Sequence, residues 1–397
     1  MRGVDRKAMA ALSSGHLAAD LAQGALPALL PYLVVKFDLS YTMAATLVLA
    51  ATISSSVVQP AFGLWSDARG ALWLLPAGVV LAGAGMAAAT VAPSYPLLLG
   101  AVLVSGLGVA AYHPEGSKFA SYVSGKRRAS GMALFSIGGN VGFALGPLVA
   151  SFAIVTLGLG LEGGALVAVP GIAIAAYLIA THAHLARFTP SVTGREARRA
   201  AGPTERRGLA LLIAVIGLRS LAHMGLFTFV PLWEVAQGRS EAYGTRLLAA
   251  FLLAGAVGTL AGGPLADRFG RRRVLVWSFV LAAPLVFVYV TVGGLVGAIA
   301  LVLSGAAIIG TFGVSLVMSQ EYMPGRVGMA SGLSIGFAIG LGGVAAVTLG
   351  AVADAVDLET ALLLCAAGPA AAILLTLALP PSRRPGPVEP AAAPASL

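Results

Sequence analysis

Ionisable side chains stand inside the first long apolar stretch of the chain, where charge is costly. His16, Asp20 and Gln23 are spaced at i, i+4 and i+7, so they share one face of a helix. A charged side chain at the centre of a bilayer costs about 2.5–3.5 kcal/mol on insertion scales. A carboxyl group there binds a proton when buried and releases it when it meets water or a cation. We predict that Asp20 binds and releases one proton as its surroundings alternate between buried and wet, and that His16 relays this proton.

Two further acids are candidates for the same chemistry, both near the ends of later apolar stretches. Glu115 follows His113 by two residues and is the second choice for the proton site. An ion pair between Glu115 and a loop arginine is the alternative interpretation. Glu321 is the third choice, and it is expected to act as a gate partner of Arg326 or of the end of the 95–118 helix.

Polar residues at helical spacing also occur inside other apolar stretches. Arg219 and His223 are four residues apart, and Arg219 is the one cation that lies within a predicted membrane helix and away from its ends. Its guanidinium could neutralise Asp20 or bind a carboxylate or phosphonate group of a substrate. Polar contacts between helices are the alternative, and for serines and threonines such as Thr311, Ser315 and Ser319 we prefer it. The expected substrate cavity consists of Gln23, Gln59, Ser136, Asn140, Arg219 and His223.

Composition indicates what must hold these residues in place. Of the 397 residues, 58% are apolar and 10% charged, whereas soluble proteins average about 25% charged residues. Apolar stretches long enough to cross a bilayer recur along the chain. The sequence predicts an all-α membrane protein with helices at 9–35, 42–65, 71–92, 95–118, 131–157, 163–183, 208–236, 243–266, 273–292, 295–320, 327–353 and 359–380.

The predicted helices form two halves of six, covering 1–183 and 208–380, and two segments lie outside them. Residues 184–207 form a polar, basic linker, and residues 381–397, rich in proline and alanine, form a tail that we expect to be disordered. No motif for a cofactor, a metal or a nucleic acid is apparent, so none is expected as a partner.

The distribution of the basic residues predicts the topology. If the amino terminus is cytoplasmic, only Lys36, Arg239 and Arg246 fall on the opposite side and Arg219 falls within a helix, which leaves 21 of the 25 lysines and arginines in cytoplasmic segments. Cytoplasmic loops of membrane proteins carry such an excess. Both termini and the linker are therefore expected in the cytoplasm, and the net charge of +9 reflects topology.

A short charged pattern occurs twice, once in each predicted half. Gly63 and Asp67 are four residues apart, as are Gly263 and Asp267. A glycine lets two helices approach, and a carboxylate near the start of the following helix meets the positive end of its dipole. We predict a conformational latch, with a purely topogenic basic loop as the alternative. The expected latch or gate residues are Gly63, Asp67, Arg69, Gly263, Asp267, Arg268, Gly270, Arg271, Glu321 and Arg326.

Both loops resemble the signature loop of the major facilitator superfamily, which is complete in the second half and degraded in the first. The stretches 16–23, 55–60, 113–115, 138–142 and 320–329 together resemble its fosmidomycin-resistance branch. Gly142, Gly146 and Pro147 are similar to the antiporter motif of the superfamily, although Leu148, Val149 and Ala150 replace its trailing glycines. The resemblance implies a proton-coupled antiporter of the bacterial inner membrane that exports a small molecule or drug by alternating access, with a monomer as the default state.

Three other functions are kept as alternatives. Proton-coupled uptake of a small metabolite would use the same fold in the opposite direction. A membrane-embedded enzyme could use His16, Asp20, His113 and Glu115 as metal ligands, but the chain has no His-Glu-x-x-His pair and no Gly-x-Ser-x-Gly motif. A channel or receptor does not need two repeated halves with matching latch loops, a pattern typical of transporters.

Overall fold

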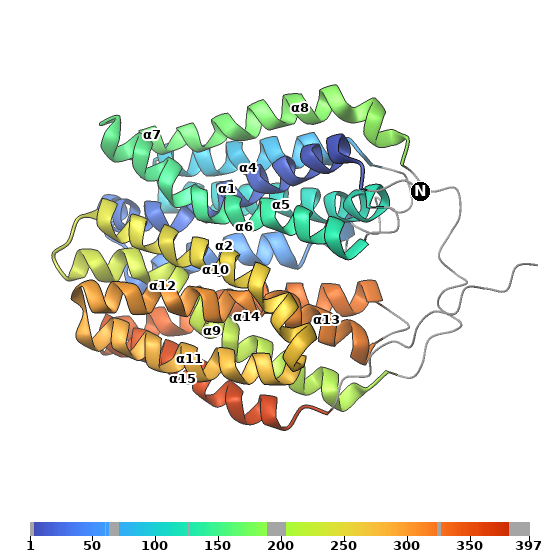
Figure 1. Cartoon of the computed structure of the whole chain (residues 1–397). Coiled ribbons are helices and arrows are strands. Elements are labelled where there is room, and N and C mark those ends of the chain that lie inside the picture. Colours follow the sequence, from blue (N-terminus) through green and yellow to red (C-terminus); the bar gives the residue numbers. More distant parts are fainter. Residues whose placement is uncertain are drawn as a thin grey trace, which may run out of the picture.

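The computed structural model describes residues 4–59, 61–62, 71–124, 128–188, 204–323 and 327–380, and these residues contain helices and turns but no strand. The helices run side by side in two bundles (Figure 1). The first bundle contains α1 (Arg6–Phe37), α2 (Tyr41–Ser56), α4 (Leu74–Val91), α5 (Tyr95–Val123), α6 (Arg128–Ser151), the π-helical turn η1 (Phe152–Thr156), α7 (Gly160–Gly163), the 3-10 turn η2 (Gly164–Val167) and α8 (Ala168–Ala186).

The second bundle has the same plan. It contains α9 (Arg206–Ala236), α10 (Glu241–Phe269), α11 (Arg271–Val292), α12 (Gly294–Gly310), α13 (Phe312–Tyr322), α14 (Val327–Ala355) and α15 (Leu358–Leu377). We call the end of the molecule at which α1 begins the near end, and the opposite end, which carries the turns at 38–40 and 237–240, the far end (Figure 1).

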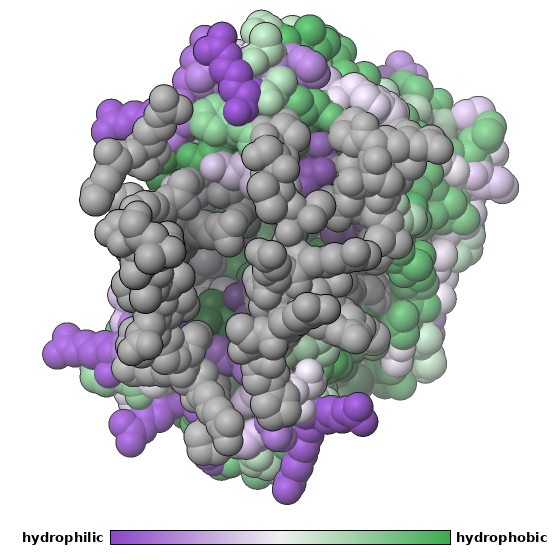
Figure 2. Space-filling model, turned by 90° about the vertical axis from the view of Figure 1, so that its right-hand side faces the viewer, coloured by the Kyte–Doolittle hydropathy of each residue, from purple (hydrophilic) through white to green (hydrophobic). Residues whose placement is uncertain are grey.

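Length and composition identify the helices as membrane helices. Eleven helical segments of the described chain are long and apolar enough to cross a bilayer, and α2, with 16 residues, supplies a shorter apolar helix. Large apolar side chains such as Ile179, Leu281 and Leu295 are exposed on the outer faces of α8, α11 and α12. Hydrophilic residues gather at the rim of the near end, and the side wall is hydrophobic (Figure 2). Such a surface suits lipid around the bundle and water at its ends.

Several predicted helices differ from the observed ones: the prediction at 131–157 ends in the π-helical turn η1, and the one at 163–183 includes the 3-10 turn η2. The helix expected at 42–65 ends at Ser56, and residues 63–65 of that prediction lie outside the described chain. The helix expected at 295–320 is two helices, α12 and α13, separated at Thr311. The Thr311 hydroxyl bonds to the Ile308 carbonyl at 3.3 Å, which competes with regular helical bonding. This break gives Phe312 the first position of α13.

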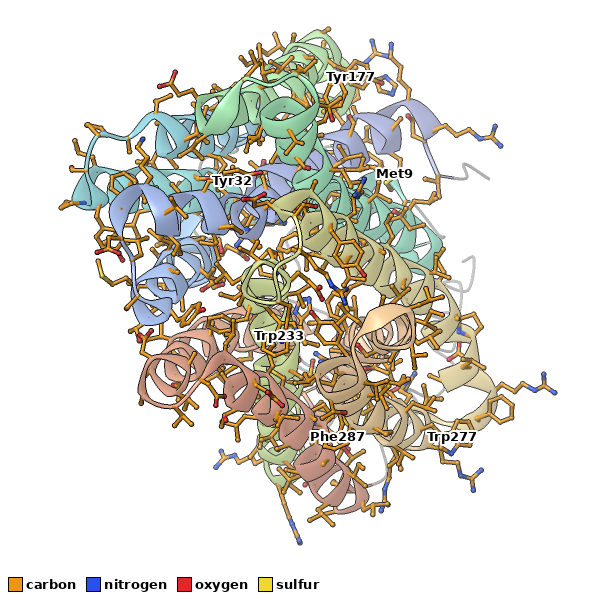
Figure 3. The ribbon with its side chains drawn as sticks, turned by 90° about the vertical axis from the view of Figure 1, so that its left-hand side faces the viewer. Met9, Tyr32, Tyr177, Trp233, Trp277 and Phe287 are labelled. Carbon is orange, nitrogen blue, oxygen red and sulfur yellow. The ribbon has the colours of Figure 1, made fainter. Side chains whose placement is uncertain are left out.

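The two bundles contact each other through α2 and α14 and through α6 and α10. Trp233, near the end of α9, lies between the bundles when the far end faces the viewer (Figure 3). The residues of the candidate site come from α1, α5 and α6 on one side of this interface and from α9 and α13 on the other.

Candidate functional site

Three of the predicted ionisable residues meet between α1 and α5. His16 Nε2 lies 3.2 Å from one carboxylate oxygen of Asp20, and His113 Nε2 lies 3.1 Å from the other. The side chains of His16 and Asp20 are 12% and 13% exposed, and that of His113 is 22% exposed. The sequence placed His16 and Asp20 together because they share a helix face, whereas His113 was assigned to a separate pair with Glu115. The structure instead unites His113 with Asp20.

The cluster is ordered by the packing of α6 directly on α1. A Cβ atom at Gly138, Gly142 or Gly146 would collide with a backbone carbonyl oxygen of α1, so only glycine permits this approach. Gly139, on the same helix, faces the cluster, because a Cβ there would lie 2.6 Å from the Asp20 carboxylate. The two glycines of the predicted antiporter motif, Gly142 and Gly146, therefore belong to this helix contact. The motif's Pro147 lies inside α6, one residue further on.

Two imidazoles and a carboxylate are groups that also bind divalent cations, and their ligand atoms lie within 4.8 Å of one another. Each Nε2, however, faces its own carboxylate oxygen at hydrogen-bond distance. The arrangement is that of two hydrogen bonds that share one acid.

Glu115 lies two residues after His113 in α5 and has a different partner. Its carboxylate is buried and lies 2.7 Å from Lys118 Nζ, three residues on in the same helix. The sequence left an ion pair with a loop arginine open as the alternative to proton binding, and a helical lysine, Lys118, is one cation that Glu115 contacts. Glu115 therefore already holds a counter-ion in this structure.

Arg219 lies in the second bundle, and its side chain is buried. Its Nη1 donates to the Ser315 hydroxyl at 2.9 Å, and its guanidinium stacks 3.9 Å from the centre of the Phe312 ring. The buried Nε has no acceptor, and Arg219 forms no ion pair with any residue of the described chain. His223, one turn away, is buried beside the same Phe312 ring, with centroids 5.3 Å apart. A guanidinium with free donors can bind an oxyanion in two-point fashion.

The remaining predictions for the substrate cavity concern the pairing of Asp20 with Arg219 and the positions of four polar residues. The neutralisation of Asp20 by Arg219, one of two predicted roles, does not occur in this structure. Gln23 is buried and donates to the Ser55 hydroxyl at 3.4 Å. Gln59, Ser136 and Asn140 are half-buried.

The predicted latch is only partly within the described residues. Gly63, Asp67, Arg69 and Arg326 lie outside them. In the second half, no atom would meet a Cβ at Gly263, and the close helix approach is made by Gly262 against the Gly310 carbonyl. The expectation that Gly263 makes this approach is wrong by one residue, a quarter-turn of helix.

The acids and arginines of the same loop have separate contacts. Asp267 is exposed, and it pairs with no cation of the described chain. Arg268 lies over the Phe269 ring. Gly270 joins α10 to α11 with a φ of +92°, a backbone conformation that favours glycine. Arg271 Nη1 pairs with Glu321, so the predicted gate acid braces α13 to α11 within one half.

A contact between the halves was not predicted from the sequence. The two carboxylate oxygens of Asp354, in the last turn of α14, accept hydrogen bonds from the backbone amides of Tyr41 and Thr42 at 2.8 and 2.9 Å. Those amides begin α2 and have no partner within their own helix. An acid is unfavourable at the carboxyl end of its own helix, and the two hydrogen bonds to α2 offset that cost. Asp354 therefore joins the two halves at the far end by capping a helix of the other half.

Comparisons with known proteins agree with this architecture. A model of the "Major Facilitator Superfamily" matches residues 12–347 and 240–397. The chain is 32% identical over 372 residues to "Uncharacterized MFS-type transporter YfnC" of Bacillus subtilis, covering 91% of this chain and 90% of that protein. It is 30% identical over 385 residues to the "Fosmidomycin resistance protein" of Escherichia coli, covering 94% and 93%.

Solved structures share the fold. A bacterial homologue of the human lysosomal transporter Spinster, in an inward-facing and occupied conformation, has a TM-score of 0.79 at 15% identity, with 96% of this chain and 97% of that chain covered. The outward-facing transporter FucP has a TM-score of 0.62 at 18% identity, covering 94% and 100%. The chain therefore belongs to the major facilitator superfamily, whose members transport small molecules and are not enzymes.

Proposed function

We propose that this protein is a proton-coupled antiporter that exports a small anionic molecule, such as a phosphonate, by alternating access. Protons exchange at Asp20, flanked by His16 and His113, and the substrate anion binds at Arg219. The observation that carries the proposal is the contact of one membrane carboxylate with two imidazoles. Imidazole is the side chain that ordinarily exchanges protons near neutral pH, and two imidazoles here contact the same carboxylate.

The position of Asp20 supports its choice over Glu115. Asp20 is partly exposed, and both of its partners are themselves titratable. Glu115 is buried against Lys118, a cation that stays charged at neutral pH. A proton that binds to the Asp20 cluster meets partners that can themselves gain or lose protons, whereas a proton that binds to Glu115 weakens an existing ion pair with Lys118.

The substrate class follows from Arg219. A cation buried in a membrane protein without a counter-ion is costly, and the free Nε donor gives an anion a place to bind. The relative named for fosmidomycin resistance supports export of a phosphonate. The arrangement of the basic residues supports a bacterial inner-membrane protein with both termini and the 184–207 segment in the cytoplasm and, as the simplest state, a monomer.

The decisive experiment compares Asp20→Asn with Glu115→Gln in proteoliposomes that contain a labelled phosphonate and an imposed pH gradient. Asp20→Asn should lose accumulation driven by the gradient but keep exchange of substrate at equal concentrations, because it keeps the shape of the side chain and removes its titration. Glu115→Gln should still accumulate substrate. Normal pumping by Asp20→Asn would pass the role to Glu115, and normal pumping by both variants would contradict proton coupling at these acids.

Direction and topology need separate tests. In inverted vesicles the exporter should accumulate substrate when the lumen is acidified, and loss of substrate under that gradient would favour proton-coupled uptake. Cysteines introduced between 184 and 207 should react only from the cytoplasmic side. The one native cysteine, Cys365, is buried and gives little background. Labelling from outside intact cells would overturn the topology.

A further inference from the structure

The histidines of the Asp20 cluster are oriented by backbone carbonyls. His16 Nδ1 lies 2.8 Å from the Phe135 carbonyl of α6, and His113 Nδ1 lies 3.0 Å from the Val109 carbonyl of α5. A carbonyl oxygen can only accept a hydrogen bond. Each Nδ1 therefore carries a hydrogen, and in a neutral ring each Nε2 would carry only a lone pair.

Both Nε2 atoms face carboxylate oxygens, which also carry only lone pairs when Asp20 is ionised. Contacts of 3.2 and 3.1 Å between two acceptors are repulsive unless a hydrogen lies between them. We infer that the cluster binds two protons, one in each contact, so that two imidazolium rings flank one carboxylate. The charge of the cluster is then +1, and it falls to −1 when both protons leave.

The neighbouring groups do not compensate the charge of Asp20, because each of them has another partner. The Tyr112 hydroxyl donates to the Leu12 carbonyl, and Phe135 stacks on the His16 ring with centroids 4.2 Å apart. Of the other charged groups on the helices around α1, Glu115 pairs with Lys118, His184 with Asp5, and Arg219 with the Ser315 hydroxyl. Among the described residues, no fixed cation contacts Asp20, so only protons on the histidines compensate its charge.

The inference rests on the proposed proton coupling and changes its stoichiometry. A single acid would exchange one proton in each cycle, whereas this cluster exchanges two. His113 becomes a proton-binding residue equal to His16. The driving force available for export then doubles at a given proton gradient, because two protons return for each substrate.

The first test counts hydrogens on the histidine rings. The protein contains five histidines, so ¹⁵N-histidine labelling of untagged protein in nanodiscs gives a spectrum that single His→Gln variants can assign. At about pH 7.5, where an unperturbed histidine is mostly neutral, the His16 and His113 rings should each carry hydrogen on both nitrogens. Asp20→Asn should abolish both signals together, and His182→Gln, which removes an exposed histidine, should leave them unchanged. One doubly protonated ring, or none, would overturn the inference.

The second test separates this inference from the proposed function. The gradient that just halts phosphonate movement in proteoliposomes gives the number of protons per substrate, which should be two in the wild type and one in His113→Gln. A wild-type value of one would remove the second proton and leave proton coupling intact. A value of zero would remove the proposed coupling itself.

Discussion

The two halves of the molecule place different chemistry at related positions. In the first half, α1 and α5 hold a carboxylate between two imidazoles. In the second, α9 and α13 hold an arginine whose partners are a hydroxyl and an aromatic ring. Under the proposed function, the first set is a switchable charge, because it exchanges protons, whereas Arg219 is a permanent charge, because a guanidinium stays protonated. The comparison teaches that two halves built on the same plan can carry a switchable charge in one half and a permanent charge in the other.

The largest effect is expected when the charge of Arg219, the fixed cation of the second half, is removed. Arg219→Ala should weaken phosphonate binding by at least about 10-fold, because a hydrogen bond to a charged group contributes roughly 1.5–3 kcal/mol. Arg219→Lys should weaken binding nearly as much if the planar fork is needed. Calorimetry on purified protein measures both. Wild-type affinity in Arg219→Ala would place the substrate elsewhere.

A substitution that crowds the Asp20 cluster should impair proton coupling and leave substrate binding intact. Gly139→Ala would press a methyl group against His16 and Asp20, so gradient-driven accumulation should fall about 10-fold, as for a mispositioned proton carrier. Phosphonate binding should change little, because Arg219 is untouched. Gly100→Ala is the matched control, since a Cβ there meets no atom. Equal losses in the two variants would show a general intolerance of alanine.

A smaller effect is expected where the halves are joined at the far end. Asp354→Asn weakens the cap on α2 and should favour opening of that end by about 1 kcal/mol, the scale of one hydrogen bond. The measurement is the distance distribution between spin labels at Val35 and Gln237. Asp357→Asn is the control, because Asp357 caps α15 within its own half. Equal shifts in the two variants would deny Asp354 a role between the halves.

The smallest effect is expected at the starts of α1 and α9. Hydrogen bonds from His184 and from the Ala8 amide hold the pKa of Asp5, which lies before the first membrane helix, below its usual value. This stabilisation is present above the unfolded pKa of about 3.9 and is lost as the pH falls through the lower folded value. Asp5→Asn should cost at most about 1 kcal/mol, a typical N-cap effect. Thermal melting at several pH values tests it.

The corresponding helix of the second half provides the control. Glu205 caps α9 by accepting from the Gly208 amide at 3.1 Å and has no histidine partner among the described residues. Glu205→Gln should therefore lower the melting temperature with less dependence on pH. A pH dependence equal to that of Asp5→Asn would mean that His184 contributes nothing.

Much of the fold could be predicted because a bilayer imposes simple rules on sequence. Helix lengths follow from its thickness, and the number of helices from the basic loops. Asp20 could be singled out because an acid in an apolar helix is expensive. Its partnership with His113 could not, since 93 residues separate them and the contact depends on how α1 and α5 pack.

The errors share a cause. Thr311 lies in an apolar run that reads as one helix, and its break depends on a local hydrogen bond. Asp354 looks like an ordinary loop acid until α2 is placed beside α14. Both depend on bonding of backbone groups, which a hydropathy pattern does not record.

The glycines that seat α6 on α1 also limit how the protein can evolve. Any single replacement at Gly138, Gly142 or Gly146 would separate two helices that hold the proton cluster. Few mutations at the contact between α1 and α6 are therefore tolerated when the protein is selected for a new substrate. The wall around Arg219 and Phe312 is built from side chains, which can be exchanged one at a time. Diversification of substrate range should concentrate there, while the first half keeps the same sequence across cargoes.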